Sequence, residues 1–233
     1  MHRESAAPTP AALTGAPGSK SAEPLRARRR RELRQHISDV ATRMFFEEGF
    51  DAVRVADIAT ASGVTEKTVF NHFPTKESLL ADRWELRIAN ARRILSDPHT
   101  APVAAMVRIV KDDLALLVAP PWPTLMGSYL ADMERYSDLI RDTPSLRTHE
   151  REQLNVLTAA VADALAERDH RSAVTGSDPE RWITATAVVG LWSVYSRSLH
   201  RAIQARQAGD LNTLQTSVTE DVSRAAAVLT RGL

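Results

Sequence analysis

The 233-residue sequence contains no cysteine, which excludes a disulfide framework and a metal site built on thiolates. No uninterrupted apolar run approaches the roughly 20 residues that a membrane span requires, and the N-terminal segment lacks the apolar region of a secretory signal. The sequence has no Gly-rich phosphate loop, His-x-x-x-His pair or nucleophile elbow, and its seven histidines are scattered. We therefore predict a cytoplasmic protein that does not span a membrane, is not an enzyme and needs no cofactor or metal.

Charge is distributed unevenly along the chain. The net charge is only +1, but residues 26–34 hold six arginines against one glutamate. Such a run can neutralise phosphates and attract a protein to nucleic acid, although the solvated start of a helix would have the same composition. Residues 1–25 are rich in Ala, Pro, Ser, Thr and Gly without apolar periodicity, so we predict a disordered tail there.

The segment 55–73 predicts two short helices separated by a tight turn. Apolar residues recur at helical spacing in the first helix, and Gly63 ends it because glycine tolerates the left-handed backbone of such a turn. Thr65 is placed to cap the second helix, which Pro74 stops after about two turns. This is the pattern of a helix-turn-helix with a short recognition helix.

The outer side of the second helix is polar. Its residue types form hydrogen bonds to base edges and phosphates, which favours DNA binding. Amphipathic helix pairs with a Gly turn also occur in proteins of other kinds, so the neighbouring residues decide between the two interpretations. The outward residues are Thr65, Glu66, Lys67, Thr68, Asn71 and His72.

The rest of the chain also reads as helix. Apolar stripes predict a long helix over 28–48 before the helix-turn-helix and a fourth helix over 76–97 that connects it to a second body. The fold class is therefore all-α, with an N-terminal three-helix helix-turn-helix domain over 26–76 and a C-terminal helical ligand-binding and dimerisation bundle over 77–233. Within the bundle, further helices are predicted over 103–117, 126–140, 144–168, 179–207 and 211–230.

The run FFEEGFDAVRVADIATASGVTEKTVFNHFPTKESLL, residues 45–80, resembles the DNA-binding domain of TetR-type bacterial transcriptional regulators. The resemblance extends over roughly residues 30 to 80. The residues that fall at the spacing of that family are Gly49-Phe50, Asp57-Ile58-Ala59, Gly63-Val64, Phe73-Pro74 and Lys76-Glu77.

The resemblance implies specific DNA contacts. Lys76 would meet the DNA backbone at the start of the fourth helix, and Arg54 stands where the family usually has a capping Thr, so it could make its own phosphate contact. Phe70 stands where a Tyr hydroxyl often touches phosphate, and it can offer only packing. Together the predicted DNA-binding residues are Arg28, Arg30, Arg54, Thr65, Lys67, Thr68, Asn71, His72 and Lys76.

The helix 179–207 is apolar on two sides, which is typical of a central helix or of one shared with a second subunit. The resemblance implies that the last two helices, about 179–207 and 211–230, pair with their mates in a homodimer. Two recognition helices about 34 Å apart would then read a palindromic double-stranded DNA operator. In this family such a regulator is most often a repressor that a small-molecule effector releases.

Helix bundles hold small molecules in mostly apolar pockets with a few convergent polar groups. Residues 135–168 resemble regulators grouped with acyl-CoA and mycofactocin-type sensors, which implies a long, apolar effector with an anionic end near Arg141 or Arg147. For each aromatic or Met candidate, ordinary core packing is the alternative, and a DNA-binding architectural or interaction protein without an effector is the alternative function. The candidate ligand residues are Trp122, Met126, Tyr129, Met133, His149, Gln153, Trp182, Thr186 and Trp192.

Overall fold

The computed structural model describes residues 25–80, 84–118, 129–168, 178–205 and 211–232. Within these ranges all regular secondary structure is α-helical, as the sequence predicted. The predicted N-terminal tail lies outside the described residues except for Leu25, which begins the first helix. None of the described helices is long and apolar enough to span a bilayer.

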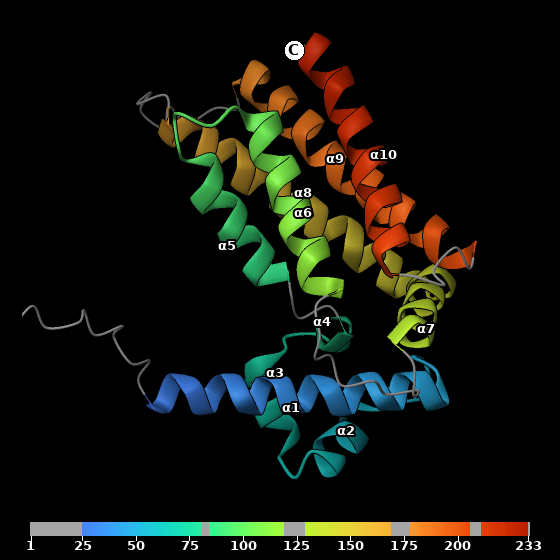
Figure 1. Cartoon of the computed structure of the whole chain (residues 1–233). Coiled ribbons are helices and arrows are strands. Elements are labelled where there is room, and N and C mark those ends of the chain that lie inside the picture. The colour runs from blue at the N-terminus through green and yellow to red at the C-terminus, as the bar shows by residue number, and fades with distance from the viewer. Residues whose placement is uncertain (1–24, 81–83, 119–128, 169–177, 206–210, 233) are drawn as a thin grey trace, which may run out of the picture.

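The N-terminal domain is built on one long helix. In Figure 1 this helix, α1, crosses the lower part of the molecule, with α2 below it, α3 passing behind it and α4 between it and the bundle. Its core contains the fully buried side chains of Ile37, Phe45, Ile58 and Phe73. The four helices are α1 (Leu25–Glu48), α2 (Val55–Ala61), α3 (Glu66–His72) and α4 (Lys76–Leu80).

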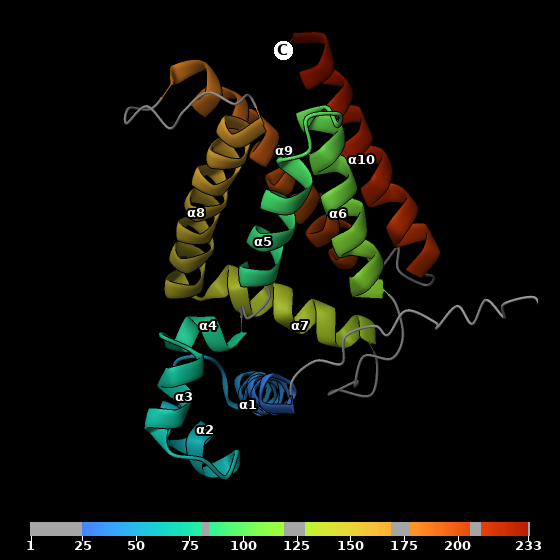
Figure 2. The ribbon, with the colours of Figure 1, turned by 90° about the vertical axis from the view of Figure 1, so that its left-hand side faces the viewer.

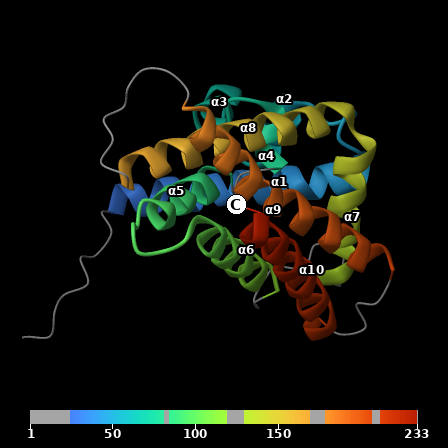
Figure 3. The ribbon, with the colours of Figure 1, turned by 90° about the horizontal axis from the view of Figure 1, so that it is seen from above.

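The second part of the chain is a bundle of longer helices. Seen from above in Figure 3, α9 lies between α8 and α10 and packs against both. Figure 2 shows α7 lying crosswise between the bundle and α1. The helices are α5 (Trp84–Leu95), α6 (Pro102–Val118), α7 (Tyr129–Asp142), α8 (Pro144–Arg168), α9 (Pro179–Gln204) and α10 (Leu211–Gly232).

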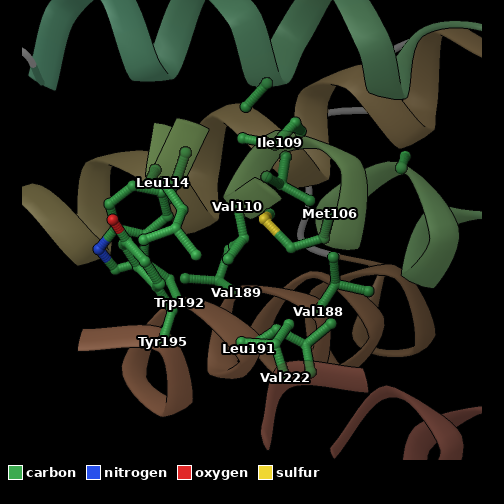
Figure 4. Close-up of a cluster of buried hydrophobic side chains, with 14 of the residues drawn as sticks. Met106, Ile109, Val110, Leu114, Val188, Val189, Leu191, Trp192, Tyr195 and Val222 are labelled. Carbon is green, nitrogen blue, oxygen red and sulfur yellow. The ribbon is translucent and has the colours of Figure 1, made fainter. Parts of the chain in front are cut away.

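The bundle core forms where α6, α9 and α10 meet (Figure 4). Their apolar stripes interlock because residues three and four apart share a helix face. The cluster is closed against water, which is the main source of stability for helices of this kind. Its labelled members are Met106, Ile109, Val110, Leu114, Val188, Val189, Leu191, Trp192, Tyr195 and Val222.

The connection between the two parts differs from the prediction of one continuous helix over 76–97. The structure describes α4 and α5 as separate helices that point in different directions (Figure 2). Leu79 and Leu80 belong to the N-terminal core, whereas Trp84 belongs to the bundle core. The carbonyl of Leu79 also accepts a hydrogen bond of 2.9 Å from Ser38 Oγ of α1. α4 packs on α1, whereas α5 packs on α6 and α8; residues 81–83 between them lie outside the described residues.

The N-terminal core extends into the bundle. Leu146 of α8 is buried in it, and Tyr136, Leu139 and Ile140 of α7 pack against it. The two predicted domains therefore share an apolar contact through α7, and a rearrangement within the bundle can reach α1 directly.

Candidate nucleic-acid interface and ligand cavity

The turn between α2 and α3 has the local structure that the sequence predicts. Gly63 adopts φ +68°, a left-handed conformation that side chains with a Cβ rarely adopt. Thr65 Oγ1 accepts a hydrogen bond of 3.2 Å from the backbone amide of Thr68, so it caps α3. Val69 is buried against the core, which leaves the opposite side of α3 outward.

The outward side of α3 lies at the end of the molecule far from the C-terminus of α10 (Figure 1). Thr65, Lys67 and Asn71 are exposed there, and Thr68 is half-buried with its hydroxyl 2.9 Å from that of Thr65. Phe70 is 48% exposed beside them. This surface therefore offers a cation, an amide and hydroxyls for polar contacts, and one large apolar side chain for packing.

His72 lies differently from the other residues predicted on α3. It is half-buried, and its Nδ1 atom is buried with no hydrogen-bond partner among the described residues. Burial lowers the pKa of His72, and the positive charges of Arg30 and Arg34 lower it further. Both effects disfavour the charged imidazolium, so His72 is a weaker candidate for a charged phosphate contact than an exposed residue of α3.

Arg34 holds the C-terminal end of α3. Its guanidinium donates to the backbone carbonyl of His72 and lies 4.2 Å from the centre of the Phe73 ring. One of the carbonyls that a helix end leaves without an internal partner is thereby satisfied. Arg34 thus fixes α3 on α1, a role that sequence reasoning missed because the residue was counted only as one of the basic run.

Lys76 is also partly withdrawn from solvent. Its Nζ atom lies 4.5 Å from the Phe50 ring centre and 5.8 Å from that of Phe45. Burial lowers the pKa of Lys76, while the charges of Asp51 and Glu77 oppose that shift. A phosphate contact at the start of α4 would require this side chain to leave the aromatic rings.

The remaining predicted DNA residues are exposed arginines. Arg54 precedes α2, where its own backbone amide donates to Asp57 Oδ2 at 3.3 Å; a guanidinium has no acceptor with which to cap the helix. Arg28 and Arg30 lie on the first turns of α1, and Arg28 forms a 2.7 Å ion pair with Glu32. Both ends of that pair are exposed, so a phosphate could compete for Arg28 at little cost.

A cavity of about 890 Å³ lies between α1 and the bundle. Of the predicted ligand residues, Met133, His149 and Trp192 line it. Gln153 lines a separate depression of about 250 Å³. Trp182 and Thr186 are exposed on α9 and are not brought to the cavity. Trp122, Met126 and the side chain of Tyr129 lie outside what the structure describes.

The N-terminal domain contributes one wall of the cavity. Gln35, Ser38, Thr42 and Phe46 of α1 face it together with residues of α5, α7, α8 and α9. Arg135 of α7 binds the end of α1 on this side, since its Nη2 and Nε atoms lie 2.8 and 3.2 Å from the carbonyl oxygen of Phe46. A ligand in the cavity would therefore touch the helix on which the helix-turn-helix is mounted.

A buried ion pair supports the bundle side of the cavity. Arg87 of α5 donates to both carboxylate oxygens of Asp113 on α6, at 2.9 and 3.3 Å, and the hydroxyl of Tyr195 donates to Asp113 Oδ2 at 3.0 Å. The guanidinium also lies 5.3 and 4.9 Å from the ring centres of Trp84 and Trp192. Burial alone would lower the pKa of Arg87, but the charge of Asp113 and its hydrogen bond raise it overall.

Sequence reasoning searched for aromatic, Met and polar residues at inward positions and did not include Arg87, Asp113, Arg135 and Glu150. The sequence did contain a signal for Arg87 and Asp113. Each is a charged residue next to the apolar stripe of its helix, and a charge at such a position is rarely buried without a partner. Arg135 and Glu150 had no comparable signal, because their roles depend on how α7 and α8 pack.

The sequence matches known bacterial regulators. Residues 37–82 match the family described as bacterial regulatory proteins, tetR family. The HTH-type transcriptional regulator AcrR of Shigella flexneri is 42% identical over 59 residues, covering 25% of this chain and 27% of that protein. The putative mycofactocin biosynthesis transcriptional regulator MftR of Mycobacterium tuberculosis is 34% identical over 70 residues, covering 30% of this chain and 35% of that protein. The chain thus spans 27% and 35% of the length of these two relatives.

The fold also matches a solved structure over most of its length. Native NalD, the secondary repressor of the MexAB-OprM multidrug efflux pump in Pseudomonas aeruginosa, superposes with a TM-score of 0.50 at 18% identity. The match covers 84% of this chain and 97% of that one, and at this identity it shows the fold alone. Together with the geometry of the helix-turn-helix, the sequence matches confirm the resemblance seen in the sequence: residues 37–82 form a helix-turn-helix domain of the tetR family of bacterial regulatory proteins.

Proposed function

We propose that the protein is a DNA-binding transcriptional repressor that reads a palindromic operator as a homodimer and is released by an apolar small-molecule effector. The observation that carries this proposal is the position of α1. One helix supports the exposed polar face of α3 and also forms a wall of the 890 Å³ cavity. Effector binding and DNA reading therefore act on the same rigid element.

The outer surface of the last helices supports dimerisation. Trp182 and Ile183 of α9 are 46% and 60% exposed, and Val228 of α10 is also exposed. Large apolar side chains gathered on neighbouring helices are typical of protein interfaces. A two-fold interface through α9 and α10 would bury them and would set two α3 helices on one side of a duplex.

Release follows if the effector binds the DNA-incompetent arrangement more tightly. An effector shifts an equilibrium only by its differential affinity for the two states, and 1 to 3 kcal/mol is typical of such coupling. The cavity contains Phe46 of α1 and Met133 of α7, so an apolar ligand between them would change the spacing of the two helices. The cavity also distinguishes this function from that of an architectural protein, for which a solid bundle would suffice.

The function is tested by selecting DNA with the purified full-length chain. From a random duplex library, we expect enrichment of an inverted repeat whose half-sites are about one or more helical turns apart. Sedimentation should show a dimer both free and bound. Enrichment of an asymmetric site, or a monomer at micromolar concentration, would contradict the proposal.

The basic start of α1 is expected to supply affinity without selectivity. Replacing Arg28 and Arg30 with Ala should weaken binding to operator and unrelated duplexes alike, and should reduce the slope of log K against log salt by about 2 if both arginines contact phosphates. Fluorescence anisotropy at several salt concentrations measures both effects. Arg108→Ala, which removes an exposed charge from α6, is the matched control. An unchanged slope in the double variant would remove these residues from the interface.

The link between Arg135 and the end of α1 is expected to stabilise the wall of the cavity. Arg135→Ala leaves the Phe46 carbonyl without this donor, which should cost about 1 kcal/mol locally and accelerate hydrogen exchange of the last amides of α1 about fivefold. Exchange measured by mass spectrometry on the full chain gives the comparison. Arg151→Ala removes a guanidinium that, within the described residues, donates a hydrogen bond to Thr148 of its own helix, and it should leave α1 unchanged. Equal protection in both variants would show that Arg135 does not hold α1.

A further inference from the structure

The polar groups of the cavity are not balanced in charge. Arg87 is committed to Asp113 by two hydrogen bonds, and Asp113 also accepts one from Tyr195. Glu150 of α8 lines the same cavity, is partly buried, and has neither a hydrogen bond nor an ion pair among the residues that the structure describes. Arg87 is neutralised by Asp113 behind it, so it is not free to pair with the Glu150 carboxylate; the other acidic residues of the lining are Asp39 and Asp132.

The environment of Glu150 destabilises its ionised carboxylate as long as no partner compensates for the lost hydration. Burial raises the pKa of Glu150, and the charge of Arg87 offsets this only in part. A partly buried carboxylate without an ion pair has lost part of its hydration. A cation that binds beside it is strongly attracted, because it replaces that lost hydration.

The basic residues of the cavity do not provide that cation. The other arginines of the cavity lining are exposed, from which we infer that they stand where the cavity opens to solvent, at its mouth. Arg141 forms ion pairs of 2.7 Å with Asp138 and 2.9 Å with Asp142. Arg201 is 73% exposed and faces Asp221, and Arg197 is also exposed. The remaining arginine of the mouth, Arg147, is exposed and donates to a backbone carbonyl of α7. These groups are hydrated or paired, so they neither neutralise Glu150 nor leave an inward positive site for an anion.

The other walls suit an organic cation. Trp84 and Trp192 already hold the Arg87 guanidinium over their rings, at 5.3 and 4.9 Å from the ring centres, whereas Tyr136 lines the cavity and is only half-buried. Aromatic faces attract alkylammonium groups, and attract them more strongly where water is excluded. Met133 and the apolar residues of α1 and α9 provide surface for a hydrocarbon body.

We propose that the effector is a cationic amphiphile, an amine or quaternary ammonium group on an apolar body, with Glu150 as its counter-ion. The inference rests on the proposed effector-controlled function and names the ligand class of the same cavity. The proposed effector is positively charged, whereas the weak resemblance of residues 135–168 implied an effector with an anionic end. Arg141 and Arg147, which that resemblance suggested as partners of the anion, lie at the mouth and not against the apolar walls.

The test compares three probes of one chain length on the full-length protein: decyltrimethylammonium, decanol and decanoate, each below its aggregation concentration. Calorimetric titration should give the tightest binding for decyltrimethylammonium. Glu150→Gln should weaken that probe about 10- to 100-fold, should leave decanol unchanged, and should improve decanoate. Glu150→Asp, which keeps the charge, should retain the preference for the cation.

Glu152→Gln is the matched control, because this exposed residue lies on the same helix outside the cavity. It should change none of the three affinities, and thermal unfolding of each variant shows that it is folded. Preferential binding of decanoate by the unaltered protein, or an equal loss for the cation and decanol in Glu150→Gln, would overturn the assignment of charge while leaving an apolar effector in place. Failure of all three probes to bind would instead contradict the effector cavity itself.

Discussion

Replacing Lys67 and Asn71 with Ala is expected to remove sequence-selective DNA binding while leaving the dimer intact. Both side chains are exposed on the polar face of α3, and neither is tied to the fold by a hydrogen bond or ion pair between described residues. Each well-placed contact to a base contributes about 1 to 3 kcal/mol of discrimination. The double variant should therefore lose roughly 2 to 5 kcal/mol of operator preference, measured as the ratio of affinities for the selected site and a scrambled duplex.

Arg231→Ala is the control for the loss of one positive charge, because Arg231 lies in the last turn of α10, at the end of the molecule away from α3 (Figure 1). It should leave the affinity ratio unchanged. The helical signal and the sedimentation of the double variant should equal those of the unaltered chain, since α3 keeps its cap at Thr65 and its buried Val69. An unchanged ratio in the double variant would show that α3 does not read bases.

The local structure of the helix-turn-helix was predictable from sequence because each feature depends on a few neighbouring residues. Gly63 permits the left-handed turn, Thr65 supplies the capping oxygen, and Val69 is the inward apolar position. The environment of His72 was not predictable in the same way. Its backbone carbonyl accepts a hydrogen bond from Arg34, which is 38 residues away along the chain, and no helical periodicity relates two such positions.

The residues that line the cavity were even harder to predict from the sequence. Met133 and Trp192 were expected to line it because large apolar residues point inward on amphipathic helices. The same reasoning placed Trp182 there, on the same apolar side of the helix as Trp192, but Trp182 is half-exposed in the first turn of α9. Periodicity shows which side of a helix faces inward, but it does not show how far along the helix its neighbours extend to cover that side.

Asp113→Asn is expected to be the most destabilising single change in the cavity wall. The substitution preserves volume and an acceptor for Tyr195, but it leaves the Arg87 guanidinium without its counter-ion between two indole rings. Removing one partner of a buried ion pair typically costs about 3 to 5 kcal/mol, because the remaining charge is then unpaired. Urea unfolding at one fixed protein concentration measures the loss, since the stability of a dimer depends on concentration.

Two further variants show whether the stability lost in Asp113→Asn comes from the lost charge or from other contacts of the side chain. Asp112→Asn changes the neighbouring residue of α6, whose 3.9 Å pair with Arg108 is exposed, and it should cost less than about 0.5 kcal/mol. Arg87→Met combined with Asp113→Asn removes both charges and should recover at least half of the stability lost in the single variant. If the double variant is as unstable as Asp113→Asn alone, the loss comes from hydrogen bonds of Asp113 other than its pairing with Arg87. Recovery would instead show that this wall is held by one mutually neutralised pair, which leaves Glu150 as the charge that a ligand must meet.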